Sequence, residues 1–231
     1  MKIHNKQEQE LLTIYTTNHL GCNNICYQCQ QQNKLDWLPI SAWFVGNQFY
    51  SDKYKILFIG KSARGTLGNK FEYFSNVFND GRKLWNKSWP YWSYTRTIVQ
   101  KLYGDDNAEH IAFTNIVKCN KSLTGDKTTD SMKQYCITQN GFIKNEINIL
   151  KPNIIIFYTG YNYDTYIHTI FDKFEPIIDS TIANGKVTIP WLEAAVQLNG
   201  KNMHLLRTAH PQNKNKEDFV NAIVNWIYKL N

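Results

Sequence analysis

Four short, almost wholly apolar segments most constrain how this chain folds. They are residues 55–60 (KILFIG), 111–117 (IAFTNIV), 153–158 (NIIIFY) and 203–208 (MHLLRT), and residues 187–190 add a weaker one. Their length and their β-branched and aromatic content are typical of buried strands. Helical spacing of apolar residues fills the intervals, over residues 94–103, 129–151, 161–174 and 216–230. This alternation predicts an α/β fold, a three-layer α/β/α domain with a mostly parallel central sheet.

Length and composition limit the class of protein. The chain has 231 residues, 42% of them hydrophobic and 14% aromatic, which is typical of one globular domain spanning residues 1–231. No apolar run reaches membrane-spanning length, and the polar amino-terminal residues lack a signal-peptide core. We therefore expect a cytoplasmic monomer without a membrane partner.

The charge balance bears on the partner. The formal net charge is +7 and the isoelectric point is near 9.0. An excess of positive charge attracts polyanions such as DNA, although many basic proteins never bind nucleic acid.

Five cysteines are unevenly spaced, at Cys22, Cys26, Cys29, Cys119 and Cys136. Disulfides are disfavoured in a reducing compartment, and clustered cysteines in such a protein indicate a metal or an iron–sulfur cluster. The first three form C-x3-C-x2-C within residues 21–34, which we expect to be a loop. Three thiolates cannot close a tetrahedral site, so the fourth ligand must come from elsewhere in the chain.

The same C-x3-C-x2-C spacing occurs in radical S-adenosylmethionine enzymes, which gives an alternative interpretation. Those enzymes need a large partial β/α barrel after the motif, and here a polar segment and about two hundred residues follow. The two later cysteines would also have no role.

Polar residues follow three of the apolar segments, at residues 60–69, 115–119 and 208–211. Ligands of parallel α/β sheets bind beyond the carboxyl ends of the strands, so these ends are where we expect a site. The stretch after Gly60 is rich in small and basic residues but lacks the order of a P-loop. Around Pro90 lies an aromatic cluster, of which one or two rings are candidates for stacking on a base.

Taken together, these segments resemble the uracil-DNA glycosylase superfamily, and most closely its iron–sulfur family 4 type. Residues 113–119 (FTNIVKC) with Cys136 resemble one family segment, residues 150–160 (LKPNIIIFYTG) another, and His210–Pro211 the start of its HPS motif. The resemblance covers roughly residues 22–215. A further family segment aligns with residues 90–103, so that residues 71–89 are an insertion.

The resemblance implies a role for each matching residue. Asn115 recognises the edge of a uracil-like base, His210 stabilises the departing base, and Tyr91, with Trp92 as second choice, stacks on it. Four residues are expected on DNA phosphates: Ser62, Arg64, Lys118 and Gln212. Four cysteines are expected to hold a [4Fe–4S] cluster, or zinc as the alternative: Cys26, Cys29, Cys119 and Cys136. Cys22 is left over, and it replaces Cys26 if the loop is wound differently.

Two departures from the family pattern bear on activity. Where the family has G-E-x-P-G, the chain has Gly60-Lys61-Ser62-Ala63-Arg64, so a lysine replaces the acidic residue, and Gln212 replaces the serine of HPS. Lys61 near the sugar is a candidate amine nucleophile. We therefore expect a DNA-repair hydrolase, a glycosylase that excises a deaminated or altered base. The alternative is a catalytically inactive nucleic-acid- or nucleotide-binding module on the same fold.

Overall fold

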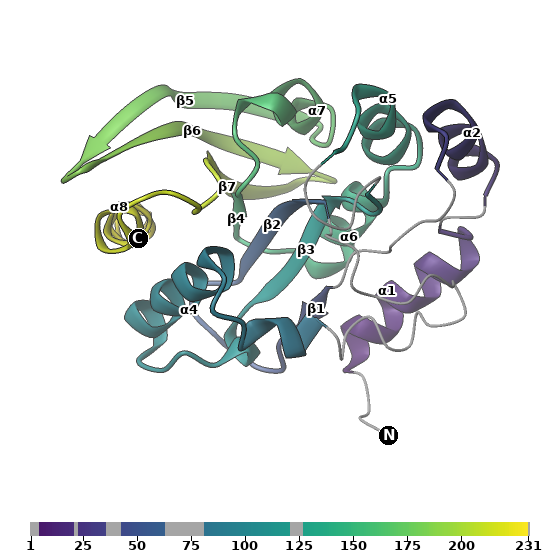
Figure 1. The fold of residues 1–231 in the computed structure, drawn as a ribbon. Coiled ribbons are helices and arrows are strands. Elements are labelled where there is room, and N and C mark those ends of the chain that lie inside the picture. Colours follow the sequence, from purple (N-terminus) through teal and green to yellow (C-terminus); the bar gives the residue numbers. More distant parts are fainter. Residues whose placement is uncertain (1–4, 21–22, 36–42, 63–80, 121–126, 231) are drawn as a thin grey trace.

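The fold is built around one seven-stranded sheet. The computed structural model describes residues 5–20, 23–35, 43–62, 81–120 and 127–230. In chain order the strands are β1 (Phe44–Val45), β2 (Ile56–Ser62), β3 (Ala112–Val117), β4 (Ile154–Phe157), β5 (Lys173–Asn184), β6 (Val187–Leu198) and β7 (Lys201–Thr208). In space their order is β1-β3-β2-β4-β7-β6-β5 (Figure 1).

The direction of the strands corrects one expectation. The four inner strands β3, β2, β4 and β7 are parallel to one another. At the edges, β1 pairs antiparallel with β3, and β6 and β5 extend the sheet antiparallel from β7. The prediction of a mostly parallel sheet is therefore right for the inner strands and wrong for the edges. The carboxyl ends of the inner strands still lie at one edge of the sheet.

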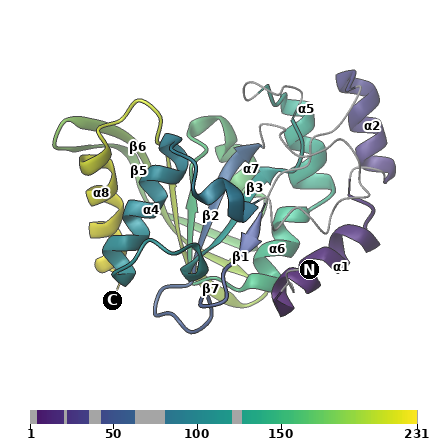
Figure 2. The same ribbon diagram turned by 60° about the horizontal axis from the view of Figure 1, so that its bottom comes forward.

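Helices cover both faces of this sheet (Figure 2). The helices α1 (Lys6–Thr17), α6 (Phe142–Leu150) and α7 (Asp164–His168) share one core with residues such as Leu57 and Ile59. On the other face, α4 (Pro90–Tyr103) and α8 (Lys216–Tyr228) share a second core with residues such as Ile56 and Phe58. Because successive strand residues point to opposite faces, one wholly apolar strand supplies both cores.

Three of the predicted segments need correction, and the first lies between β4 and β6. The predicted helix over residues 161–174 shrinks to a 3₁₀ turn (Tyr161–Tyr163) and α7, and residues from Lys173 onward form β5. β5 is exposed over most of its length because it is an edge strand. It therefore lacks the apolar alternation that marks a half-buried strand. Its turn to β6 is made by Gly185 and Lys186, with Gly185 at φ +56°.

The second correction concerns the cysteine-rich segment, which we expected to be a loop. Residues Asn24–Asn33 form helix α2, and the side chain of Asn23 caps it by accepting a hydrogen bond from the backbone N–H of Cys26. Cys26 and Cys29 therefore lie one helical turn apart and on the same side of α2. Cys22 lies outside the described residues.

The third correction concerns the long helix predicted over residues 129–151. It is divided into α5 (Asp130–Lys133), a π-helix (Gln134–Gln139) and α6, and Gly141 separates the last two with φ +62°. Cys136 lies in the π-helix. Such π-helical turns are rare in proteins, and those that occur are often at functional sites. This irregularity therefore marks Cys136 as a candidate site residue.

The helices on the second face agree better with expectation. α4 begins with Pro90, whose missing N–H costs nothing in a first turn, and ends at Gly104 with φ +90°. A short 3₁₀ turn (Ala108–His110) then leads into β3. Of the predicted insertion over residues 71–89, residues 71–80 lie outside the described part of the chain, as does Arg64. None of the described helices has the length and apolar character needed to cross a membrane.

Candidate functional site at the strand ends

The site is built on the carboxyl ends of the parallel strands, where Gly60 of β2 lies opposite Asn115 of β3. A Cβ added at residue 60 would lie 2.5 Å from the side-chain oxygen of Asn115 and 3.4 Å from the ring of Tyr91. Real Cβ atoms essentially never approach another heavy atom within 3.0 Å. Glycine at this position therefore allows the Asn115 amide and the Tyr91 ring to approach the strand end.

Tyr91 connects this pair to the end of β7. Its ring centroid lies 5.7 Å from that of His210 and 5.2 Å from that of Tyr158, the residue after β4. Tyr91 stands in the first turn of α4, and Tyr103, near the other end of that helix, donates a hydrogen bond to the carbonyl of Tyr54 before β2. α4 therefore runs antiparallel to β2 and directs its amino terminus, the positive end of its dipole, toward the strand ends.

The protonation of His210 follows from its neighbour. The backbone N–H of Gln212 donates to Nδ1 of His210 over 3.2 Å. An imidazole nitrogen that accepts a hydrogen bond carries no proton, so the proton of the neutral ring belongs on Nε2. The loop after β7 therefore assigns His210 the tautomer in which Nε2 is a hydrogen-bond donor.

The buried hydroxyls at the strand ends that have no hydrogen-bond partner among the described residues include those of Tyr91, Thr159 and Thr208. Burial raises the pKa of Tyr91 well above its ordinary value, and the nearby Tyr158 raises it further, so the phenol is neutral. Buried polar atoms in native proteins are nearly always satisfied, so unpaired hydroxyls at a strand end indicate a place for a polar ligand or water.

Trp92, our second candidate for stacking on a base, is a core residue. Only 3% of it is exposed, and its ring lies 4.6 Å from that of Phe113 and 4.8 Å from that of Tyr91. Successive helical residues point in directions about 100° apart, so Tyr91 reaches the strand ends and Trp92 packs into the second core. The expectation for Trp92 is therefore wrong.

The remaining strand-end candidates lie at the rim. Lys61 and Ser62 end β2 and are half-buried, and the Ser62 hydroxyl accepts a hydrogen bond from Thr128 over 3.1 Å. Gln212 is exposed on the loop after β7. Lys61 and Ser62 therefore follow Gly60 directly at the end of β2, and Gln212 lies two residues after His210.

Lys118 was predicted to bind DNA phosphate, and its surroundings contradict this. Its side chain is 1% exposed, and its ammonium group contacts the Glu146 carboxylate at 2.6 Å, the Thr114 hydroxyl at 2.8 Å and the Asn115 carbonyl at 2.5 Å. Three acceptors use all three ammonium protons. Glu146, also 1% exposed, accepts in addition from the Tyr15 hydroxyl over 2.5 Å. Lys118 therefore belongs to a buried network beneath β3.

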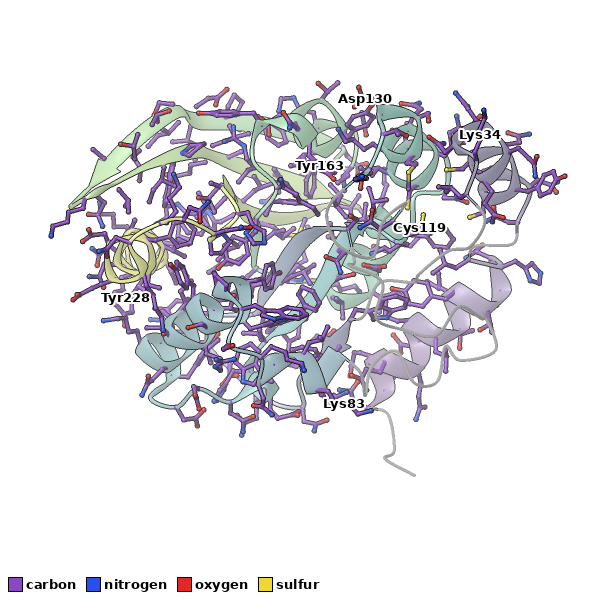
Figure 3. The ribbon with its side chains drawn as sticks, in the orientation of Figure 1. Lys34, Lys83, Cys119, Asp130, Tyr163 and Tyr228 are labelled. Atoms are coloured by element: carbon purple, nitrogen blue, oxygen red, sulfur yellow. The ribbon has the colours of Figure 1, made fainter. Side chains whose placement is uncertain are left out.

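The four predicted cysteine ligands meet beyond the end of β3. Figure 3 shows Cys119 between α2 and α5, with sulfur atoms grouped around it. Burial raises the pKa of the Cys119 thiol well above its usual range, and three neighbouring thiols raise it further, those of Cys136, Cys29 and Cys26. Burial likewise raises the pKa of Cys29 to about 11 and that of Cys136 to about 12. Segments nearly a hundred residues apart thus bring their thiols within mutual electrostatic reach.

Three of these sulfurs accept N–H hydrogen bonds. The backbone N–H of Lys118 donates to Cys136 over 3.3 Å, the Asn140 amide to Cys26 over 3.5 Å, and the Asn33 amide to Cys29 over 3.7 Å. Thiolates bound to a metal are characteristically stabilised by such donors. Within the described part of the chain, no three His, Cys, Asp or Glu side chains are arranged to hold a metal ion. Four thiols with such donors around them have the chemistry of a thiolate-bound centre.

Comparison with known proteins adds nothing to this geometry. No family model matches the chain, and no curated protein matches it. The assignment of function therefore depends on the strand-end residues themselves.

A cavity of about 400 Å³ lies elsewhere, at the amino ends of β4 and β7. It is lined by residues that include Asn148, Lys151, Lys201 and Met203. None of the predicted site residues lines it, and we do not assign it to the site at the carboxyl ends.

Sequence reasoning missed several residues that shape the site. Glu146 reads as one polar residue on an amphipathic helix, and only the fold shows that it neutralises Lys118. Thr208 is the last residue of the apolar strand β7. Its position two residues before His210 was the one feature of the sequence that could have marked it as a site residue. The sequence does not indicate that the amides of Asn33 and Asn140 donate to cysteine sulfurs. Each asparagine lies far along the chain from some of the four cysteines, so only the fold brings them together.

Proposed function

We propose that this protein binds DNA and hydrolyses the N-glycosidic bond of a uracil-like base extruded from the strand. One observation carries the proposal: Gly60, Asn115, Tyr91 and His210 come from four separate segments and meet on one face at the strand ends. A base in a duplex is inaccessible to side chains that act on it, so an enzyme of this kind accepts it as a flipped nucleotide.

Each of these groups has a chemical task. The Asn115 amide donates and accepts at once, which suits the alternating carbonyl and N–H groups of a uracil edge. The Tyr91 ring offers an aromatic surface next to that amide. The unpaired hydroxyls of Tyr91 and Thr208 are further partners for the base. The basic net charge of the chain favours the phosphate backbone, with Ser62 and Gln212 at the rim.

The reaction breaks the bond between C1′ and the base nitrogen, and the base leaves with the bonding electrons. The Nε2–H of His210 donates a hydrogen bond to the carbonyl oxygen on which the negative charge develops. Water adds to C1′ and loses a proton, giving an abasic sugar and a free base. None of the strand-end residues just named is an acid, so stabilisation of the leaving base carries more of the catalysis than activation of water.

We further propose that the four thiols hold a [4Fe–4S] cluster, with zinc as the alternative for the same donors. What supports this is the gathering of four thiols and the N–H donors around three of them. The cluster would join α2, the end of β3 and the π-helix. Its role would be structural, because Asn115 and His210 supply the groups that face the base.

An oligonucleotide assay tests the function. Uracil- and hypoxanthine-containing strands are incubated with the protein, and alkali cleavage reveals abasic product. Product from either strand supports the proposal, and Asn115→Ala should reduce it by about 100-fold or more while DNA is still retained. An equal loss of excision and of retention would remove Asn115 from base recognition.

A catalytically inactive DNA-binding module is the second candidate, and the lysine at position 61 favours it. Lys61 stands where the resembling family carries its acid. Retention of a uracil-containing strand without any abasic product would support the inactive module. Absence of both retention and product would reject both candidates.

A further inference from the structure

Trp89 is an exposed aromatic side chain at the amino terminus of α4, the helix that carries Tyr91. It is 44% exposed, whereas its neighbours in the chain Trp85 and Trp92 are 5% and 3% exposed. It occupies the N-cap position of α4, two residues before Tyr91, and its carbonyl accepts a hydrogen bond from the N–H of Ser93. An exposed indole offers a flat apolar ring to a partner.

The segment before Trp89 is held in place by hydrogen bonds to its backbone and by packing of Trp85. Arg96, about two turns further along α4, donates hydrogen bonds to the carbonyls of Trp85 and Lys87. The indole N–H of Trp85 donates to the carbonyl of Asp106 over 2.8 Å. Trp85 packs edge-on against Trp92, with ring centroids 6.1 Å apart. Trp89 is therefore presented from a loop whose backbone is fixed at several points.

Trp89 and Tyr91 differ in what they face. Tyr91 turns inward to Gly60, Tyr158 and His210. Trp89 has no such ring neighbours within the described residues and lies at the surface, two residues after the exposed Lys87. An inward aromatic ring for one base, an outward indole and a nearby lysine in the chain are the kinds of group that bind a single strand.

We propose that Trp89 stacks on the base that neighbours the extruded nucleotide, and that Lys87 contacts the phosphate between them. The inference rests on the proposed function, because it places a neighbour next to the base held at Asn115. Extrusion of one nucleotide removes a stacking partner from the next, and the exposed face of the indole replaces that partner. Stacking of this kind tolerates any base, so it adds affinity without adding sequence preference.

Fluorescent oligonucleotides test this inference. A single strand carries 2-aminopurine beside 2′-fluoro-2′-deoxyuridine, which resists excision, and a second strand carries the probe four nucleotides away. The wild-type protein should quench the adjacent probe and leave the distant one bright. Trp89→Ala should abolish the adjacent quenching and raise the Kd by about tenfold, whereas Trp89→Phe should retain most of both.

Tyr228 provides a matched control, since it is 48% exposed near the end of α8 and its hydroxyl donates to the carbonyl of Lys101. Tyr228→Ala should quench and bind like the wild type. If the wild type excises uracil but Trp89→Ala matches it in quenching and Kd, the role of Trp89 is wrong and the proposed function stands. If the wild type neither binds nor excises, both proposals fall.

Discussion

Gly60 and Asn115 face each other across β2 and β3 with no room for a Cβ between them. Gly60→Ala should therefore displace the Asn115 amide, because the new methyl carbon would lie 2.5 Å from its oxygen. We expect base excision to fall by about 100-fold, with a loss of stability of about 1–3 kcal/mol from overpacking. Abasic-product assays and urea denaturation measure the two effects.

The double variant Gly60→Ala/Asn115→Ala separates the two effects of that methyl group. Removing the amide should restore the stability lost by Gly60→Ala, because the clash disappears, while excision stays low. Independent, additive losses of stability would show that the two residues are not in contact in solution.

The hydrogen bond from Gln212 to His210 gives a second prediction. Gln212→Pro removes the backbone N–H that donates to Nδ1, so His210 is free to carry its proton on the wrong nitrogen. Excision should fall by roughly tenfold or more in the proline variant. Gln212→Ala keeps the N–H and should lose much less, no more than one phosphate contact at the rim contributes. Equal activity of the two variants would mean that this contact does not set the tautomer.

The buried pair Lys118–Glu146 predicts a large effect on stability. Lys118→Met leaves the Glu146 carboxylate buried without its cation, which should cost about 3–5 kcal/mol in the free energy of unfolding. Lys118→Met/Glu146→Gln should recover part of that loss. The exposed pair Lys144–Asp172 is the control, and Lys144→Ala should cost less than about 1 kcal/mol. Similar losses in the two single variants would contradict burial of Lys118.

The proposed cluster predicts colour and iron in freshly purified protein. Cys119→Ser should abolish the brown absorbance and reduce the iron content to background, because the thiolate is the ligand. Cys22→Ser should retain both, since Cys22 is the cysteine outside the proposed set. Zinc in place of iron would keep the four ligands and change the metal. Protein that binds neither metal would reject the centre.

The raised thiol pKa values predict how metal-free protein responds to alkaline pH. A thiol whose pKa is about 11 when folded, as at Cys29, and about 8.5 when unfolded stabilises the fold below about pH 8.5. That contribution is lost as the pH rises from there through about 11. Unfolding of the metal-free wild type should therefore become easier over this interval, and more steeply than for Cys29→Ala. Parallel profiles would contradict the burial of this thiol.

The inner strands were predictable because each is apolar on both faces and ends at a glycine or polar residue. Segments whose structure depends on contacts at long range were not. β5 does not have the sequence pattern of a half-buried strand, because as an exposed edge strand it is largely in contact with water. The π-helix at Cys136 likewise has no counterpart in the apolar pattern.

Within the site, the sequence predicted where the residues lie better than it predicted what each side chain contacts. The segment from Asn115 to Cys119 was correctly placed at a strand end, but Lys118 was expected to point to solvent. The burial of Lys118 could not be predicted from its charge. Its ammonium group is buried because it pairs with Glu146, a residue 28 positions later in the chain. The prediction for Trp92 was wrong because adjacent residues of a helix point in different directions. Only one of the two neighbouring rings of α4 can lie at the strand ends, and that ring is Tyr91.

The short segment from Asn115 to Cys119 joins three environments: the amide at the proposed base site, the buried ion pair and the thiol group. Four peptide bonds leave little slack between the first and the last of these. A change at Cys119 would therefore move the backbone that carries Asn115, so loss of the thiol group should alter the proposed base site as well as the stability of the fold.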